Sequence, residues 1–486
     1  MSLTSVDDLR DGLSGIARIV GERLEIDDEA RFRDELIDEL AFASVFDDDA
    51  ALRDACRWII WSASQALGCG SASIHELYLA RGREEFDPTQ FTVPAVNVRA
   101  ATYLTARQAF VAARERDAGT LIFEIAKSEM AYTDQRPAEY AAVILAAAIR
   151  ERWPGPVFLQ GDHFQFNATK WSTDPGAEME GLRDLTREAI AAGFCNIDVD
   201  SSTLVDLSLP TVTEQQRVNA DNTASLTRLI RELQPDGVTI SIGGEIGEVG
   251  KSNSTEEELR AYLDEYHRRL GTDASAPFGI SKISIQTGTS HGGVVLPDGS
   301  VAPVDIDFDT LRRLSAVARH EYGLAGCVQH GASTLPDGAF HHFPANGTAE
   351  IHLATGFQNI LYDGGGLPDE LRAEMMAWCL ANCPTERKPG ETDEQFLYKT
   401  RKKAIGPFKR QLWTLPDDAA REIGAHLRDK FGLLFDELNI AGNRSLVDRY
   451  VTPVPMPRPL PAALGGAERE AVSAGASVFE DDGSGE

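Results

Sequence analysis

The chain has 486 residues, of which 42% are hydrophobic, 8% aromatic and 25% charged. This length and composition exclude a small disulfide-stapled scaffold and a chain that is disordered throughout. The formal net charge is −29, from 47 basic and 76 acidic residues. Nucleic acids and anionic membranes bind through clustered Lys and Arg, so we expect neither as a partner.

Cysteine usage and hydropathy predict the compartment. The six cysteines are scattered along the chain, and no secretory leader precedes them, which favours reduced thiols. No apolar run approaches the ~20 residues that a bilayer span needs. The sequence therefore predicts a soluble, cytoplasmic protein.

The first 88 residues are predicted to be an extension that is helical throughout, because apolar residues recur at three- and four-residue spacing. From Phe91 onward, short β-branched runs alternate with longer segments of helical period. The strand candidates are residues 91–98, 120–126, 156–161, 194–199, 237–243, 281–287, 325–329 and 349–354.

Eight βα repeats predict an α/β fold, a TIM (β/α)8 barrel, over residues 89–440, with flanking helices in its C-terminal part. A doubly wound sheet is the runner-up, but its GxGxxG turn is missing. Residues 441–486 are predicted to form an extended arm and a disordered acidic tail, because Pro, Gly, Ser and acidic residues dominate there.

Three histidines each directly follow a different strand candidate: His163, His291 and His330. In a TIM barrel the C-terminal strand ends meet at one mouth, where active sites lie. Three neutral imidazoles with an open fourth position form a typical catalytic divalent-metal site. One such histidine alone is more often a core or loop residue, but the three together predict a metal centre.

Carboxylates lie on the same rim. Asp162 precedes a proposed ligand, so it is predicted to act as a general acid and base beside the metal; a turn or helix-cap role is the alternative. Asp198 and Glu245 are predicted to orient imidazoles or to hold the metal in a second position. Structural salt bridges are the alternative for these two.

Small residues after the later strands are candidates for anion binding. Gly292 and Gly331 follow two of the histidines, and glycine lets backbone N–H groups approach an anion. Together with Ser333 and Thr355 they are predicted to bind a phosphate, which this fold commonly holds after strands seven and eight. Loop flexibility is the alternative role for the glycines.

The segments that carry these residues resemble the motifs of the class II, metal-dependent fructose-bisphosphate aldolase family. In the family's order, over residues 91–365, they are VPAVNV, GDH, NIDVDSSTLVD, GEIGEVG, GTSHGGVVLPDGS, VQHGAS and, less closely, AEIHLATGFQ. The resemblance implies that His163, His291 and His330 bind Zn²⁺ or another divalent metal. It also implies that Asp162 transfers a proton at the aldehyde-side oxygen and that Gly292, Gly331, Ser333 and Thr355 contact phosphate.

The implied activity is cleavage and condensation of a phosphorylated ketose of the fructose-bisphosphate type. The metal would polarise the ketose carbonyl and stabilise the enediolate of a dihydroxyacetone-phosphate-like product. Asp198 and Glu245 would be accessory metal-site carboxylates, and we also place Glu245 beside Asp162 in the catalytic group. A monovalent cation is a second candidate cofactor. The implied activity would also place the enzyme in glycolysis. The flanking helices and a basic C-terminal segment predict a homodimer or homotetramer.

The sequence departs from the family at substrate positions. His352 stands where the family has the Asn of its NIAT motif, and Ser128 matches only loosely the Ser expected after the second strand. With Asn97 of VPAVNV, these residues are our candidates for further substrate contacts.

Two other functions remain open. LQGDHFQFNATKW resembles a stretch of the non-catalytic accessory chain of tagatose-bisphosphate aldolases, although the retained GTSHG and HGAS histidines favour an active enzyme. The second alternative is a metal-dependent lyase or epimerase acting on another sugar, which the loss of the family's Asn leaves open.

Overall fold

The computed structural model describes residues 3–247, 252–271, 279–288, 296, 306–333 and 335–467. Eight parallel strands close into a barrel in the order β10-β3-β4-β5-β6-β7-β8-β9. They are β3 (Val93–Asn97), β4 (Ile122–Ala126), β5 (Phe158–Gln165), β6 (Asn196–Asp200), β7 (Ser241–Glu245), β8 (Lys282–Ile285), β9 (Cys327–Gln329) and β10 (Glu350–Leu353). Every one of them overlaps a strand expected from the sequence, so the TIM barrel is confirmed.

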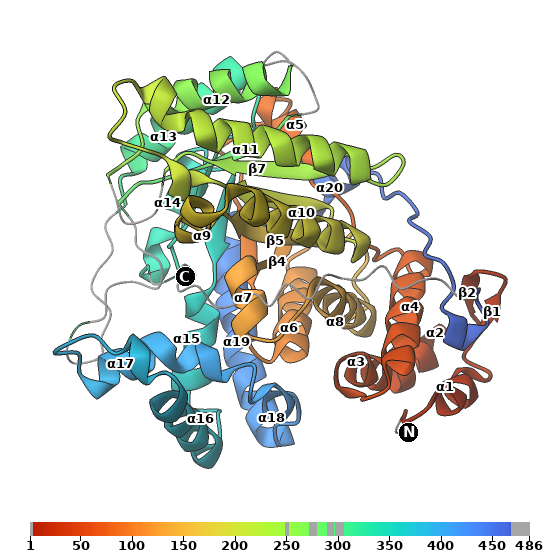
Figure 1. The fold of residues 1–486 in the computed structure, drawn as a ribbon. Helices are drawn as coiled ribbons and strands as arrows, with labels where there is room; N and C mark the ends of the chain where they lie inside the picture. Colours follow the sequence, from red (N-terminus) through yellow and green to blue (C-terminus); the bar gives the residue numbers. More distant parts are fainter. Residues whose placement is uncertain are drawn as a thin grey trace.

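Helices between the strands form the outer layer of the barrel (Figure 1). They are α6 (Thr102–Glu115), α7 (Lys127–Tyr132), α8 (Pro137–Arg150), α9 (Ala168–Thr173), α10 (Pro175–Ala191), α11 (Val212–Leu233), α12 (Glu256–Leu270), α13 (Phe308–Tyr322), α14 (His342–Ala345) and α15 (Thr355–Asp363). Helix α11 begins with a capping box in which Thr211 and Glu214 satisfy each other's backbone N–H groups. Short 3-10 turns, η2 (Ser202–Leu204) and η3 (Asp337–Ala339), follow β6 and β9.

The N-terminal extension is not helical throughout, contrary to our expectation. Its helices are α1 (Val6–Leu13), α2 (Glu29–Arg31), the π-helical turn η1 (Phe32–Leu36), α3 (Ile37–Phe46), α4 (Ala50–Ala66) and α5 (His75–Gly82). Between α1 and α2, β1 (Ala17–Val20) and β2 (Arg23–Ile26) pair as an antiparallel hairpin. Gly21 has φ +62°, which suits the first position of its two-residue turn. The short alternating runs ARIV and RLEI are typical of strands, and helical periodicity does not predict them.

Helix α5 lies across the N-terminal end of the barrel. The Tyr78 hydroxyl donates a hydrogen bond to Glu350, the first residue of β10. Arg81 donates to the carbonyl oxygens of Phe91 (2.7 Å) and Thr348 (2.8 Å), which precede β3 and β10. Since all of these partners precede or begin strands, α5 closes the end of the barrel opposite the mouth.

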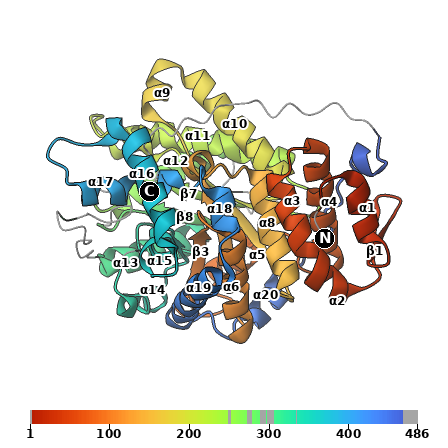
Figure 2. The ribbon, with the colours of Figure 1, turned by 90° about the horizontal axis from the view of Figure 1, so that it is seen from below.

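The C-terminal segment covers the flank of the barrel and then returns to the N-terminal helices. Its elements are α16 (Asp369–Asn382), η4 (Pro384–Glu386), α17 (Asp393–Thr400), η5 (Arg401–Ala404), α18 (Lys409–Trp413), α19 (Asp417–Glu437), α20 (Arg444–Tyr450) and η6 (Ala462–Leu464). Helix α19 packs on α6, and Figure 2 shows α16 and α17 on the opposite side of the molecule from α1, α3 and α4.

An extended arm after α20 reaches α4. The indole nitrogens of Trp58 and Trp61 donate to the carbonyl oxygens of Arg458 (3.0 Å) and Met456 (2.8 Å). The acidic tail predicted beyond this arm, residues 468–486, lies outside the described residues. None of the helices in the described ranges has the length and apolarity that a bilayer crossing requires.

Candidate metal and catalytic site

A β-bulge in β5 brings Asp162 and His163 to the same site. In a regular strand successive side chains point to opposite faces. Here the register against β6 shifts between Gly161 and Phe164, and His163 has φ +39°, a left-handed conformation that is uncommon outside glycine. A Cβ on Gly161 would lie 2.5 Å from the Phe164 ring, so this bulge requires glycine.

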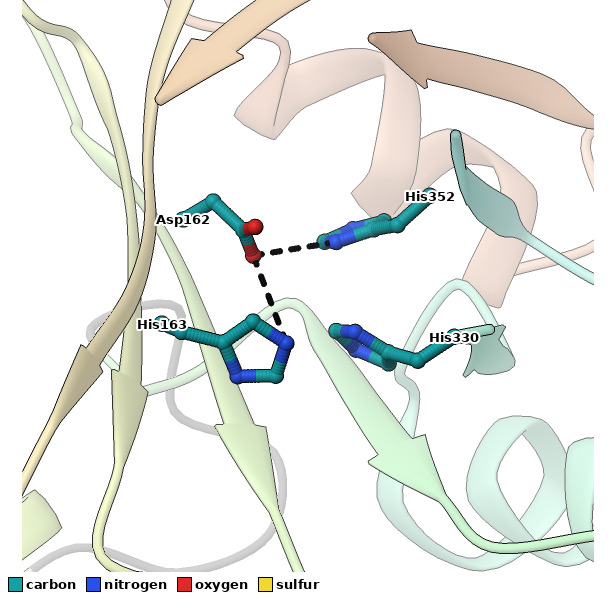
Figure 3. Close-up of side chains that lie close together, drawn as sticks. All are labelled: Asp162, His163, His330 and His352. Atoms are coloured by element: carbon teal, nitrogen blue, oxygen red, sulfur yellow. Dashed lines mark hydrogen bonds and ion pairs between the residues drawn. The ribbon is translucent and has the colours of Figure 1, made fainter. Parts of the chain in front are cut away.

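Four buried side chains converge at this point: Asp162, His163, His330 and His352 (Figure 3). They come from β5, the end of β9 and β10, and one ligand atom from each lies within 4.8 Å of all the others. Oδ1 of Asp162 lies 3.0 Å from Nδ1 of His352 and 3.8 Å from Nε2 of His163. The ring centroid of His330 is 4.3 Å from that of His163 and 4.2 Å from that of His352.

Two carboxylates hold the far side of the His163 ring. Its Nδ1 lies 3.2 Å from Oδ2 of Asp200 and 3.3 Å from Oε2 of Glu245. Burial raises the pKa of Glu245 to about 8. Glu245 thus contacts an expected metal ligand, in the position of a group that orients it. Asp200 was not predicted, although it lies two residues after Asp198 and therefore on the same face of the strand.

Asp198 lies among the interior charged groups of the barrel. Its Oδ2 lies 2.9 Å from Nζ of Lys282, which also donates to Gln160 (2.8 Å) and to Glu350. Despite burial, the negative charges of Asp198 and Glu350 raise the pKa of Lys282, so its ammonium group stays charged. One set of side chains close enough to hold a metal ion is Glu124, Asp162, Asp198 and His352. Another set is His163, Asp200 and Glu245.

The predicted substrate residue Asn97 holds Asp162. Its Nδ2 donates to Oδ2 of Asp162 (2.8 Å) and to Oε2 of Glu129 (2.9 Å). Burial opposes ionisation of Asp162, but the charges of His163 and His352 lower its pKa well below the usual range. Ser128 lies half-buried in the first turn of α7, next to Glu129.

Three predicted phosphate residues lie at the adjoining ends of β9 and β10. Gly331 has φ +68°, and the Ser333 hydroxyl accepts a hydrogen bond from the backbone N–H of Ala354 (2.6 Å). Thr355 is the first residue of α15, and its hydroxyl accepts from Arg99 (3.3 Å). Arg99, which was not predicted, also pairs with Glu129, and its side chain is 2% exposed. The fourth predicted phosphate residue, Gly292, and the predicted metal ligand His291 lie outside the described residues.

The chemistry of the donor set fits a divalent metal. Imidazole nitrogens and carboxylate oxygens are ligands of Zn²⁺ and related ions, and outer carboxylates that orient the imidazoles are typical of such sites. Asp162, His163 and His330, which the sequence predicted as one site, lie together here with His352.

Comparisons with known proteins identify a family for this chain. The family model described as fructose-bisphosphate aldolase class-II matches residues 84–405. No curated protein matches the chain. Among solved structures, the YdjI aldolase from Escherichia coli K12 is 14% identical, with 77% of this chain and 99% of that chain covered and a TM-score of 0.44.

Two further solved structures have similar coverage. The fructose-bisphosphate aldolase from Campylobacter jejuni is 17% identical (78% and 98% covered, TM-score 0.45). A protein described as a probable tagatose 6 phosphate kinase from Sinorhizobium meliloti 1021 is 18% identical (74% and 90% covered, TM-score 0.48). The family assignment rests on the model match, which spans all eight strands of the barrel. This chain belongs to the class II fructose-bisphosphate aldolase family and is an aldolase, a carbon–carbon lyase.

Proposed function

We propose that this aldolase cleaves and forms a carbon–carbon bond in a phosphorylated ketose of the fructose-bisphosphate type, with Zn²⁺ or another divalent ion as cofactor. The buried cluster of Asp162, His163 and His330 at the strand ends carries the proposal. His163 and His330 would hold the ion, together with His291, whose role the family implies. When bound, the ion supplies a Lewis acid for the ketose carbonyl and for the negative charge that develops beside it.

Asp162 would move the proton. In cleavage its carboxylate takes the proton from the hydroxyl on the carbon that becomes the aldehyde, while the electron pair of the broken bond goes to the carbonyl side. In condensation Asp162 returns this proton to the aldehyde oxygen. Asn97 occupies Oδ2 of Asp162, so Oδ1, which faces the histidines, is the oxygen that would exchange the proton.

A phosphate of the substrate would bind where β9 and β10 end. Ser333 and Thr355 lie at the start of α15, where backbone N–H groups favour an anion, and Gly331 lies two residues before Ser333. Gly292 is proposed for the same subsite from the family motif. A homodimer or homotetramer, a monovalent cation, a cytoplasmic location and a role in glycolysis belong to the same proposal.

The proposal is tested by elemental analysis of the purified protein and a cleavage screen over phosphorylated ketoses. We expect about one tightly held divalent ion per chain, loss of turnover on chelation, and recovery when the ion is restored. A protein that holds no divalent ion and cleaves no ketose after metal addition would instead be a non-catalytic subunit.

The substrate has a second candidate class. His352 stands at the position of the family's Asn, which leaves open a metal-dependent lyase or epimerase acting on another sugar. The screen therefore includes unphosphorylated ketoses and sugar acids. If the enzyme turns over only unphosphorylated ketoses or sugar acids, the proposed substrate class changes and the proposed metal centre does not.

A further inference from the structure

We infer that His352 is itself a ligand of the metal in this chain, in addition to His163 and His330. The inference rests on the proposed function and deepens it, because it changes the composition of the metal centre. It assigns to β10 a metal ligand at a position where the family motif has an amide.

Each of the three imidazoles is anchored on one nitrogen by a group outside the cluster. Asp200 and Glu245 hold Nδ1 of His163. The Ser284 hydroxyl lies 2.8 Å from Nε2 of His330, and Oε1 of Glu350 lies 2.6 Å from Nε2 of His352. Such outer partners fix the ring orientation and tautomer of metal-bound histidines. A shared ion would therefore bind Nε2 of His163 and the Nδ1 atoms of His330 and His352.

Glu350 is held as a charged acceptor for this purpose. Besides His352 it accepts hydrogen bonds from Lys282, Gln160 (2.9 Å) and the Tyr78 hydroxyl. All of these groups are buried. Because a carboxylate with this many donors accepts rather than donates, Nε2 of His352 carries a hydrogen. Nδ1 lies 3.0 Å from Oδ1 of Asp162 and 3.3 Å from Oε1 of Glu124, and a bound ion would replace the hydrogen that Nδ1 shares with these carboxylates.

The three rings are close enough to share one ion. One ligand atom from each of them lies within 4.8 Å of the others. The Nδ1 of His352 lies 3.0 Å from Oδ1 of Asp162, which in turn lies 3.8 Å from Nε2 of His163. Asp162 would therefore border a bound ion beside the rings, where its proton-transfer role requires it.

The test compares metal binding by the wild-type enzyme with that by H352A, H352N and E350Q. Affinity for Zn²⁺ is measured by competition with a chelator, and coordination by the visible absorption spectrum of the Co²⁺-substituted protein. We expect H352A and H352N to weaken binding by more than about 100-fold and to change the Co²⁺ spectrum. E350Q, which removes only the anchoring carboxylate, should weaken binding by about 10- to 100-fold.

His341 supplies the matched control, since its side chain is 55% exposed in a neighbouring loop. H341A should bind Zn²⁺ as the wild type does. Folding of every variant is checked by circular dichroism, and if H352A does not fold, the polar H352N carries the test. Wild-type affinity and an unchanged Co²⁺ spectrum in folded H352N would overturn this inference and leave the proposed function in place. A wild-type protein that binds no divalent ion would overturn the proposed function as well.

Discussion

Both oxygens of the Asp162 carboxylate have defined partners, which makes this residue the sharpest test of the chemistry. Oδ2 accepts from Asn97, and Oδ1 faces His163 and His352. Asp162→Asn keeps the size of the side chain but removes the proton acceptor, so kcat for aldol cleavage should fall on the order of 10² or more. Metal content, measured in the same preparation, should stay at the wild-type value. Cleavage at the wild-type rate would reassign the proton transfer to another group.

The two carboxylates on His163 should tune metal affinity. Asp200→Asn weakens the acceptor for Nδ1 of His163, and we expect binding of Zn²⁺ to fall by about 10- to 100-fold. Titration against a chelator measures the change. Asp206→Asn is the control, because Asp206 follows six residues later in the chain and its side chain accepts hydrogen bonds from the local turn at Ser208. Equal affinities in both variants would show that Asp200 does not support the metal.

The site could be predicted from sequence only where its residues follow the strands. His163 and His330 stand just beyond apolar runs, where a barrel places its active site. Asp200 is the last residue of β6, and Lys282 and Glu350 are the first residues of β8 and β10. Whether such a residue faces the barrel axis depends on strand register, and the bulge at Gly161 shows that register cannot be read from alternation alone.

At the scale of elements, α5 should contribute to stability through one buried hydroxyl. Tyr78→Phe removes a donor from Glu350 in a site closed to water, and we expect the free energy of unfolding to fall by about 1.5–3 kcal/mol. Tyr103→Phe is the control: it also loses a hydrogen bond to a carboxylate, but Asp38 is 43% exposed and pairs with Arg150. Urea unfolding should show the larger loss for Tyr78→Phe; equal losses would contradict the role of α5.

The elements differ in how far the sequence determines them. Each barrel strand is an apolar run bounded by a long helix-period segment, so its existence was predictable. The β1–β2 hairpin is two four-residue runs between helices, and its pairing depends on the turn at Gly21. The division at residues 88 and 440 stays a prediction, which limited proteolysis would check.

At the scale of the whole molecule, the C-terminal arm ties the end of the chain to α4. A chain ending at Tyr450 loses the hydrogen bonds to Trp58, Trp61 and Gln65 and the burial of Met456. We expect a loss of about 3 to 7 kcal/mol in the free energy of unfolding. Urea unfolding followed by tryptophan fluorescence measures it. A chain ending at residue 467 keeps these contacts and should match the full-length protein; if both truncations behave alike, the arm does not stabilise the helical layer.

Because α5 closes the N-terminal end of the barrel, it limits how far this enzyme can be shortened. The family match starts at residue 84, two residues beyond the end of α5. A minimal catalyst cut to that match would lack the Tyr78 hydroxyl and leave Glu350, which holds His352, open to solvent from below. The N-terminal extension, which lies outside the family match, therefore supports Glu350 and, through it, His352 at the opposite end of the barrel. Removing the extension would disturb the active site without removing any residue that contacts substrate.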